Sequence, residues 1–153
     1  MTNTVIAQER PDTADARALI DELEAYLIPL SPDESRHGYS VEKLIAQGVA
    51  FFVIRVDGEA VGCGGIQLFE GEYGELKRMY VRPRCRGRGL AKKLLERLAA
   101  HARSHGIAVL RLETGVAQTE AIGLYEAWGF RQIPPFGAYK LDPHSVFYEK
   151  RLD

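Results

Sequence analysis

The sequence predicts an α/β fold in which a mixed, mostly antiparallel sheet is flanked by helices. Three observations support this prediction. The first half contains short apolar segments of strand character, two of them joined by the turn signal Asp57-Gly58. The second half alternates strand-like segments with helical patterns, in the order strand–helix–strand–helix–strand. The 153 residues suit one ordinary domain, and no linker or repeat divides them, so we expect a single domain over residues 1–153.

In the first half, a short strand is expected over residues 4–9, followed by a helix that Pro11 and Asp12 begin. This helix has apolar residues at helical spacing, and Pro29 and Pro32 follow its end. A polar loop over residues 31–40 leads to a short helix over residues 41–46, closed by Gly48.

Three strands are expected next, over residues 50–56, 60–69 and 73–81. The middle strand contains three glycines, which predict a β-bulge or a group packed close to the backbone: Gly62, Gly64 and Gly65. Further on, the expected elements are a helix that opens after Gly89, a strand over residues 107–114, a helix around Leu124, and a last strand over residues 145–152.

Bulk composition excludes several classes of protein. The net charge is −1, and no apolar run approaches the ~20 residues that span a bilayer, so we expect neither a nucleic-acid nor a membrane partner. Two cysteines, Cys63 and Cys85, do not form a disulfide framework, and a cytoplasmic location is the simplest expectation. The four histidines lack metal-ligand spacing, so we expect no metal.

Positive charge is concentrated in one segment. Nine of the 20 Lys and Arg residues lie between Lys77 and Arg97, where the only acidic residue is Glu96. One interpretation is a solvated basic face. The other is a local site for a polyanion of limited size, such as a phosphorylated cofactor.

The centre of this segment has the order strand, glycine-containing loop, helix. A helix start carries unpaired backbone N–H groups and a positive dipole end, and the glycines of the loop let a phosphate approach the backbone. A P-loop would end in Gly-Lys-Ser or Gly-Lys-Thr, and a dinucleotide fingerprint would have a third glycine where Lys92 stands. An ordinary tight connection remains the alternative.

Two linked motifs make the pattern more specific. Arg86-Gly-Arg-Gly89-Leu-Ala91 resembles R/Q-x-x-G-x-G/A, the pyrophosphate-binding motif of the GNAT superfamily of N-acetyltransferases. Leu124-Tyr125-Glu-Ala-Trp-Gly129-Phe130 resembles the second motif of that family, and the tail after Pro135 resembles a subgroup of small bacterial members. The resemblance covers the chain from about residue 50 onward. It implies a GNAT-like fold and transfer of acetyl from acetyl-CoA to a primary amine.

The resemblance also implies roles for individual residues. Backbone groups of one strand would bind the pantetheine arm, the loop would hold the pyrophosphate, and a glutamine stands where many members have asparagine. In this chain the implied cofactor-binding residues are Met79, Tyr80, Val81, Arg86, Gly87, Arg88, Gly89, Leu90, Ala91, Lys92 and Gln118. Tyr125 occupies the position of the general acid that protonates the departing thiolate, although its place in an apolar stripe also suits a core residue.

An alkyl amine with a pKa near ~10 must lose a proton before it attacks a thioester. Glu75 and Glu113 both stand where some family members hold their base, and a surface carboxylate is an equal alternative for each. Glu113 is slightly favoured, because strand ends in α/β sheets open onto ligand crevices. Direct transfer is expected, rather than a covalent route through Cys63 or Cys85.

The acceptor is expected to be a small polar amine, such as an amino acid. The segments that would line its site contain Glu34, His37, Arg78, Tyr139 and His144, whose mixed charges suit a zwitterion, although solvated loop residues are the alternative. Acetylation of a protein amine, a non-catalytic acyl-CoA sensor and a nucleic-acid-binding module that uses the basic segment are the alternative functions. A homodimer is also considered, formed by pairing of the last strand at a sheet edge.

Overall fold

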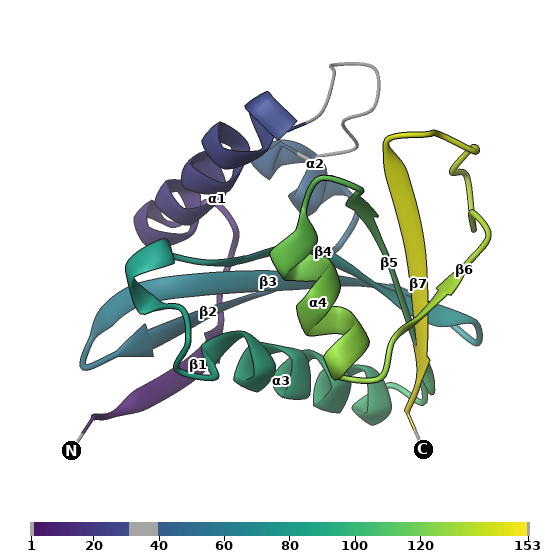
Figure 1. Cartoon of the computed structure of the whole chain (residues 1–153). Coiled ribbons are helices and arrows are strands. Elements are labelled where there is room, and N and C mark those ends of the chain that lie inside the picture. Colours follow the sequence, from purple (N-terminus) through teal and green to yellow (C-terminus); the bar gives the residue numbers. More distant parts are fainter. Residues whose placement is uncertain (1, 31–39, 153) are drawn as a thin grey trace.

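The computed structural model of the chain describes residues 2–30 and 40–152, and its centre is one seven-stranded sheet (Figure 1). The strand order is β1-β2-β3-β4-β5-β7-β6. The strands are β1 (Thr4–Gln8), β2 (Ala50–Val56), β3 (Glu59–Phe69), β4 (Tyr73–Val81), β5 (Val109–Gly115), β6 (Arg131–Ile133) and β7 (Ser145–Arg151).

Helices cover both faces of this sheet. They are α1 (Ala14–Leu27), α2 (Val41–Ala46), α3 (Leu90–Ser104) and α4 (Thr119–Ala127), with short 3-10 turns η1 (Ile28–Leu30) and η3 (Pro83–Cys85). Helices α1 and α2 lie over one face, and α3 lies under the other, with α4 beside it (Figure 1). The α/β fold predicted from the sequence is confirmed, including the mostly antiparallel sheet.

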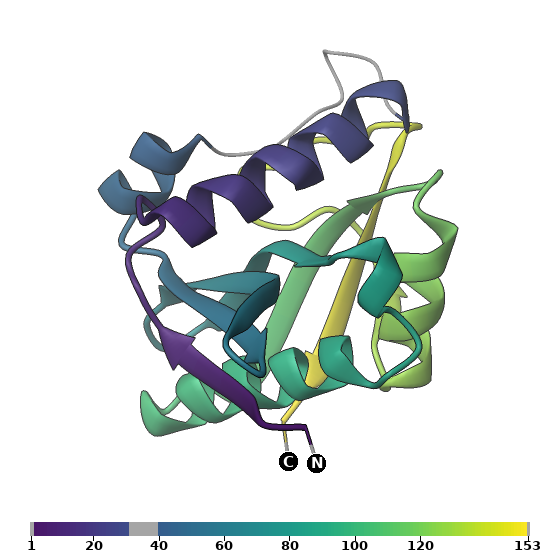
Figure 2. The same ribbon diagram turned by 90° about the vertical axis from the view of Figure 1, so that its left-hand side faces the viewer.

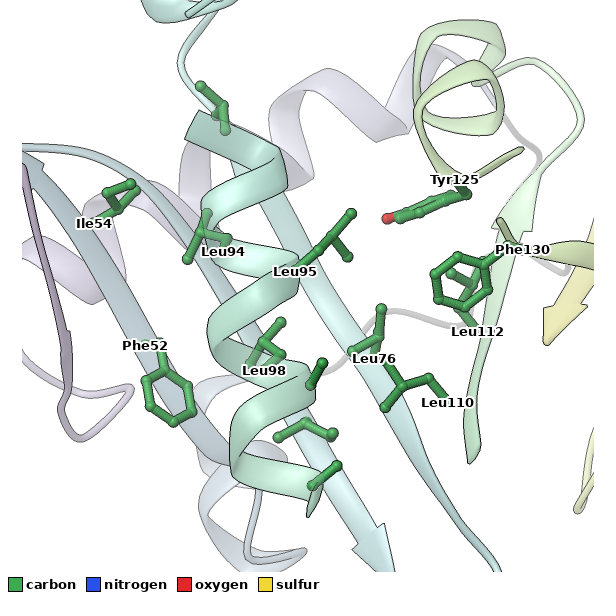
Figure 3. Packing of buried hydrophobic residues seen from close by; sticks show 14 of the residues in the cluster. Phe52, Ile54, Leu76, Leu94, Leu95, Leu98, Leu110, Leu112, Tyr125 and Phe130 are labelled. Atoms are coloured by element: carbon green, nitrogen blue, oxygen red, sulfur yellow. The ribbon is translucent and has the colours of Figure 1, made fainter. Parts of the chain in front are cut away.

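Alternation along β2 distributes the core between the two faces. Phe52 and Ile54 pack with α3 in the larger apolar cluster, whereas Phe51 and Val53 pack with α1 and α2. Figure 3 shows the leucines of α3 lying against the sheet in the larger cluster. Burial of these apolar side chains is the main force that holds α1 and α3 on opposite faces.

The pairing between β4 and β5 is short, and this feature positions the site. Within the described residues these two strands run parallel and pair at Gly74 with Leu110 and at Glu75 with Arg111. Strand β4 then continues to Val81 beside β3 alone. The strands visibly part beyond this point (Figure 2). Backbone groups on the freed edge of β4 are therefore available to a ligand.

Several boundaries differ from the sequence-based expectation. Helix α1 begins at Ala14 rather than at Pro11, because the Thr13 side chain caps it and accepts a hydrogen bond from the backbone N–H of Ala16 at 3.2 Å. Strand β5 begins at Val109 rather than at residue 107.

The place of β7 in the sheet was predicted wrongly. Strand β7 pairs with β5 on one side and with β6 on the other, so it is not the sheet edge that the dimer hypothesis needs. No helix in residues 2–30 and 40–152 has the length and apolar character to cross a bilayer.

Candidate active site

A β-bulge in β4 forms one wall of the site. The β3–β4 register shifts between Cys63 and Gly65, so that Arg78 and Met79 both lie opposite Gly64. A Cβ atom at Gly64 would lie 2.5 Å from the sulfur of Met79, so the glycine makes room for this side chain. The close packing of Met79 on Gly64 is one of the two arrangements that the glycines of β3 predicted, whereas this bulge lies in the neighbouring strand β4, where Arg78 adopts a left-handed backbone with φ +57°.

The glycine loop forms a second wall. Gly87 and Gly89 have φ values of +83° and +75°, and at both positions a Cβ would find no described atom within 4 Å. Gly89 is the N-cap of α3, and in the described chain no side chain caps this helix. The backbone N–H groups of the first turn therefore face free space with the positive end of the helix dipole, which suits a phosphate.

These walls border a cleft of about 360 Å³ between α1, the end of β4, the glycine loop, the start of α3, and α4. All of the cofactor-binding residues implied by the sequence line it except Arg88. The residues that the sequence reasoning missed are Leu23, Tyr26, Cys85, Glu120, Ala121 and Leu124. Leu23 and Tyr26 belong to α1, whose apolar stripe indicated only a core-facing helix.

Arg86 spans the cleft between three elements. Its Nε donates to the carbonyl oxygen of Val81 at 3.0 Å, and its guanidinium lies 3.4 Å from a carboxylate oxygen of Glu120 in α4. The same guanidinium lies over the ring of Tyr26 in α1, 5.6 Å from the ring centroid. A positive charge is thus held beside the glycine loop.

Tyr125 belongs both to the cleft and to the core. Its ring makes an edge contact with Phe130, at 5.6 Å between centroids, and Figure 3 shows its hydroxyl end directed toward α3 and Leu95. Burial raises the pKa of Tyr125 far above its ordinary value, so this hydroxyl keeps its proton at neutral pH. A hydroxyl in this state is a hydrogen-bond donor rather than a base.

Glu75 and Glu113 lie on the two strands that part, outside the cofactor cleft. Glu75 is 4% exposed, and its carboxylate accepts a hydrogen bond from the Tyr139 hydroxyl at 2.6 Å and lies 3.3 Å from Lys77 Nζ. Glu113 is half-buried and accepts a hydrogen bond from the Ser145 hydroxyl at 2.8 Å. The structure therefore holds both carboxylates in defined positions near the point where β4 and β5 separate.

The five residues expected to line the acceptor site do not all come together. Tyr139 lies against Glu75, whereas Arg78 is buried and forms an ion pair with Glu24 of α1. His144 is exposed, and its backbone N–H donates to Asp142 at 2.8 Å. Glu34 and His37 lie outside the described residues, so their positions stay predictions.

Both cysteines are buried. Burial raises the pKa of the Cys63 thiol to about 12, which disfavours the reactive thiolate. Cys85 is also buried, although it borders the cleft. Within the described residues, no group of three His, Cys, Asp or Glu side chains is placed to hold a metal ion.

A parallel strand pair that separates beside an uncapped helix start suits an enzyme that holds a phosphorylated thioester such as acetyl-CoA along the freed strand edge. Residues 16–130 match the model of the acetyltransferase (GNAT) family. The chain belongs to this family and is a GNAT-type N-acetyltransferase, as the sequence motifs predicted. Enzymes of this family use acetyl-CoA.

Individual relatives agree with this assignment. The chain is 45% identical over 153 residues to a protein of Azospirillum brasilense named IAA acetyltransferase, covering 99% of this chain and 100% of the relative. A crystal structure from Klebsiella pneumoniae, proposed to be an acyl-CoA N-acyltransferase, has a TM-score of 0.84 and 40% identity over 98% of both chains. A GNAT acetyltransferase from Elizabethkingia anophelis with acetyl-CoA bound shares the fold, with a TM-score of 0.73 and 18% identity over 98% of this chain and 99% of that one.

Proposed function

We propose that this enzyme transfers acetyl from acetyl-CoA directly to the primary amine of a small polar molecule, such as an amino acid, in a ternary complex. The observation that carries the proposal is the position of β4. Its last residues line the cofactor cleft, and Glu75 lies on the same strand where β5 departs from it. One strand would thus supply both the groups that bind the donor and a carboxylate for the acceptor.

The residues of the cleft suit acetyl-CoA. The freed edge of β4 at Met79, Tyr80 and Val81 would bind the pantetheine arm through backbone groups. The loop from Arg86 to Lys92 would hold the pyrophosphate through the first-turn N–H groups of α3. Gln118 borders the cleft at the start of α4, where its side-chain amide can supply a further hydrogen bond. The bound molecule supplies an acetyl thioester.

Two side chains would move the protons of the reaction. We propose that Glu75 takes a proton from the acceptor ammonium, which leaves a nucleophilic amine. The amine nitrogen forms the new bond to the acetyl carbon as the carbon–sulfur bond breaks, and the positively charged nitrogen of the adduct then releases its second proton to water. Tyr125, which borders the cleft, gives its proton to the departing sulfur and regains one from water.

Glu75 is favoured over Glu113 as the base, which reverses the preference drawn from the sequence. Glu75 stands on the cofactor-binding strand, and two neighbours, Tyr139 and Lys77, fix the orientation of its carboxylate. Glu113 is less buried and stands on the other strand, with Ser145 as its hydrogen-bond donor. Glu113 remains the alternative that the variants described in the Discussion distinguish.

A small acceptor is favoured by what covers this face of the sheet. The hydrogen bond from Tyr139 to Glu75 places the segment between β6 and β7 over β4, although β6 and β7 lie beyond β5 in the sheet. Helix α1 covers the same face of β4 from the other side, through Arg78. A carboxylate enclosed in this way is more accessible to a small molecule than to a long polypeptide.

Thiol release from acetyl-CoA with a panel of acceptors tests the proposal. The panel contains free amino acids, polyamines, aryl amines and peptides with free N-termini. It also contains IAA, the compound in the name of the Azospirillum relative. We expect turnover with small polar amines and intersecting lines in two-substrate kinetics. Turnover confined to peptides would refute the small acceptor, and parallel lines would refute direct transfer. A cytoplasmic location stays a prediction, and so does a homodimer, although β7 does not offer the free sheet edge on which that hypothesis was based.

A further inference from the structure

We propose that Arg78 is a positioning residue, which holds the bulge of β4 in the shape that binds acetyl-CoA, and that Glu24 of α1 is the partner through which it does so. The proposal rests on the cofactor cleft described above. Under this proposal, Arg78 does not make the acceptor contact that the sequence predicted, and α1 contributes to binding of the acetyl donor.

The backbone at Arg78 needs support. Its φ of +57° lies in the left-handed region, which is costly for a residue with a Cβ atom. Such a conformation persists where the surrounding structure imposes it. Asp57 is the other non-glycine residue with positive φ in the described chain, and it lies in the β2–β3 hairpin turn, where that geometry is expected.

Two contacts hold Arg78 from different sides. Its guanidinium forms an ion pair with the carboxylate of Glu24, and the Arg78 side chain is 3% exposed while that of Glu24 is 39% exposed. The Cys63 thiol of β3 donates to the backbone carbonyl of Arg78 at 3.3 Å. Side chain and carbonyl are therefore both fixed, and the peptide that joins Arg78 to Met79 has its orientation set by these contacts.

The residues that follow Arg78 are those that line the cleft. Met79, Tyr80 and Val81 border it, while the pairing of β4 with β5 has ended at Glu75, so no described strand supports that edge of β4. Helix α1 supplies support instead. In addition to Glu24, Glu22 of α1 accepts a hydrogen bond from the Tyr80 hydroxyl at 3.1 Å, which anchors the next part of the strand.

Arg78 itself does not line the cleft, so it would act on the cofactor only through this backbone. If Arg78 instead bound an acceptor carboxylate, its ion pair with Glu24 would have to break when the acceptor enters. The two roles make different predictions for removal of the Glu24 charge. If Arg78 binds the acceptor, this change would free Arg78 for it. If Arg78 positions the bulge, the same change would weaken its hold on the bulge and lower the affinity for acetyl-CoA.

Calorimetric titration of acetyl-CoA without acceptor separates these roles. Glu24→Gln and Arg78→Gly are compared with the wild-type chain, and Arg55→Gln is the matched control. Glycine tolerates φ +57° but has no ion pair. Arg55 joins the sheet to α1 through Asp15 at 2.9 Å, yet it lies on β2 and outside the cleft. We expect acetyl-CoA to bind roughly tenfold more weakly to both test variants, which is the size of effect expected when the interaction of one residue pair is lost. Its affinity for the control variant should equal that of the wild-type chain.

NMR spectra of the backbone amides provide a second measurement, which should not change if Arg78 only stabilises the fold. On addition of acetyl-CoA, the amides of Met79 to Val81 should shift in the wild-type chain and shift less in Glu24→Gln at equal melting temperature. The Arg78→Gln and Glu24→Gln effects on affinity should also be non-additive in the double variant.

Unchanged acetyl-CoA affinity in Glu24→Gln and Arg78→Gly overturns the proposal. A rise in the KM of carboxylate-bearing acceptors alone also overturns it, in favour of acceptor binding. Glu24→Gln is a mild change at a partly exposed side chain, so it keeps the test valid if Arg78→Gly fails to fold. Because the titration contains no acceptor, an error in the proposed acceptor class would leave its result unaffected.

Discussion

Substitution of Gly89 by aspartate gives a direct test of the anion site at the start of α3. The backbone at Gly89 has φ +75°, and a Cβ there would enter space free of described atoms, the same space that the proposed pyrophosphate would fill. An aspartate carboxylate at this N-cap can accept hydrogen bonds from the first-turn N–H groups. It would thus occupy the site with its own negative charge and repel the cofactor.

The expected magnitude follows from ligand linkage. Acetyl-CoA at 100 times its dissociation constant should stabilise the wild-type chain by ~2.7 kcal/mol. For a chain of this length, one kcal/mol corresponds to roughly 2–4 °C, so the melting temperature should rise by roughly 5–11 °C. In Gly89→Asp this rise should disappear at the same concentration of acetyl-CoA.

Two matched variants separate charge from backbone strain. Gly89→Ala adds a Cβ at the same positive φ without charge, and should retain part of the rise. Gly58→Asp adds the same side chain at φ +85° in a hairpin turn away from the cleft, where a Cβ also meets no described atom, and should retain all of it. A full rise in Gly89→Asp, measured by thermal denaturation, would show that the pyrophosphate does not bind here.

The remaining predictions concern single side chains. Tyr125→Phe should lower kcat on the order of 10²-fold and leave acetyl-CoA affinity unchanged, because the ring still packs on Phe130; wild-type turnover would make Tyr125 a core residue only. Glu75→Gln should remove the acidic limb of the kcat/KM profile and Glu113→Gln should keep it, and the opposite result would identify Glu113 as the base. Burial raises the pKa of Cys63 from 9.0 to about 12, so the folded state binds more protons than the unfolded state in that range, and stability should fall as pH rises from 9 to 12. Cys63→Ala should unfold with a shallower pH dependence in this window, and an identical dependence would contradict the burial argument.

Short-range signals predicted much of the fold and many of the residues that line the cleft. The periodic leucines of α3, the Asp57-Gly58 turn and the glycines around Arg86 are all local patterns. Each depends on backbone preferences within a few residues, so one sequence is enough to detect it. For the same reason, the start of α3 after Gly89 was predicted correctly, and a helix was predicted around Leu124, within α4.

Contacts between distant residues could not be predicted in this way. The partner of Arg78 is 54 residues away in the sequence, and the partner of Glu75 is 64 residues away. Strand β6 has three residues and gives no periodic signal, so the position of β7 between two neighbours was missed. The roles assigned to Arg78 and Tyr139 depend on such contacts. A charged or phenolic side chain can bind a ligand or stabilise the fold, and the residue that it faces decides between these roles.

The shortest pairing among the described strands is also the feature on which the proposed binding of the acetyl donor depends. If β4 and β5 stayed paired beyond Glu75, the backbone groups of β4 up to Val81 would be satisfied within the sheet. None would be left for pantetheine, and Glu75 would be interior to a continuous sheet. Because the strands part, the freed edge needs another source of order, and α1 provides it through Glu22 and Glu24. In the proposed arrangement, the opening between β4 and β5 exposes the edge that would bind the donor, and the acidic side chains of α1 would hold that edge in place.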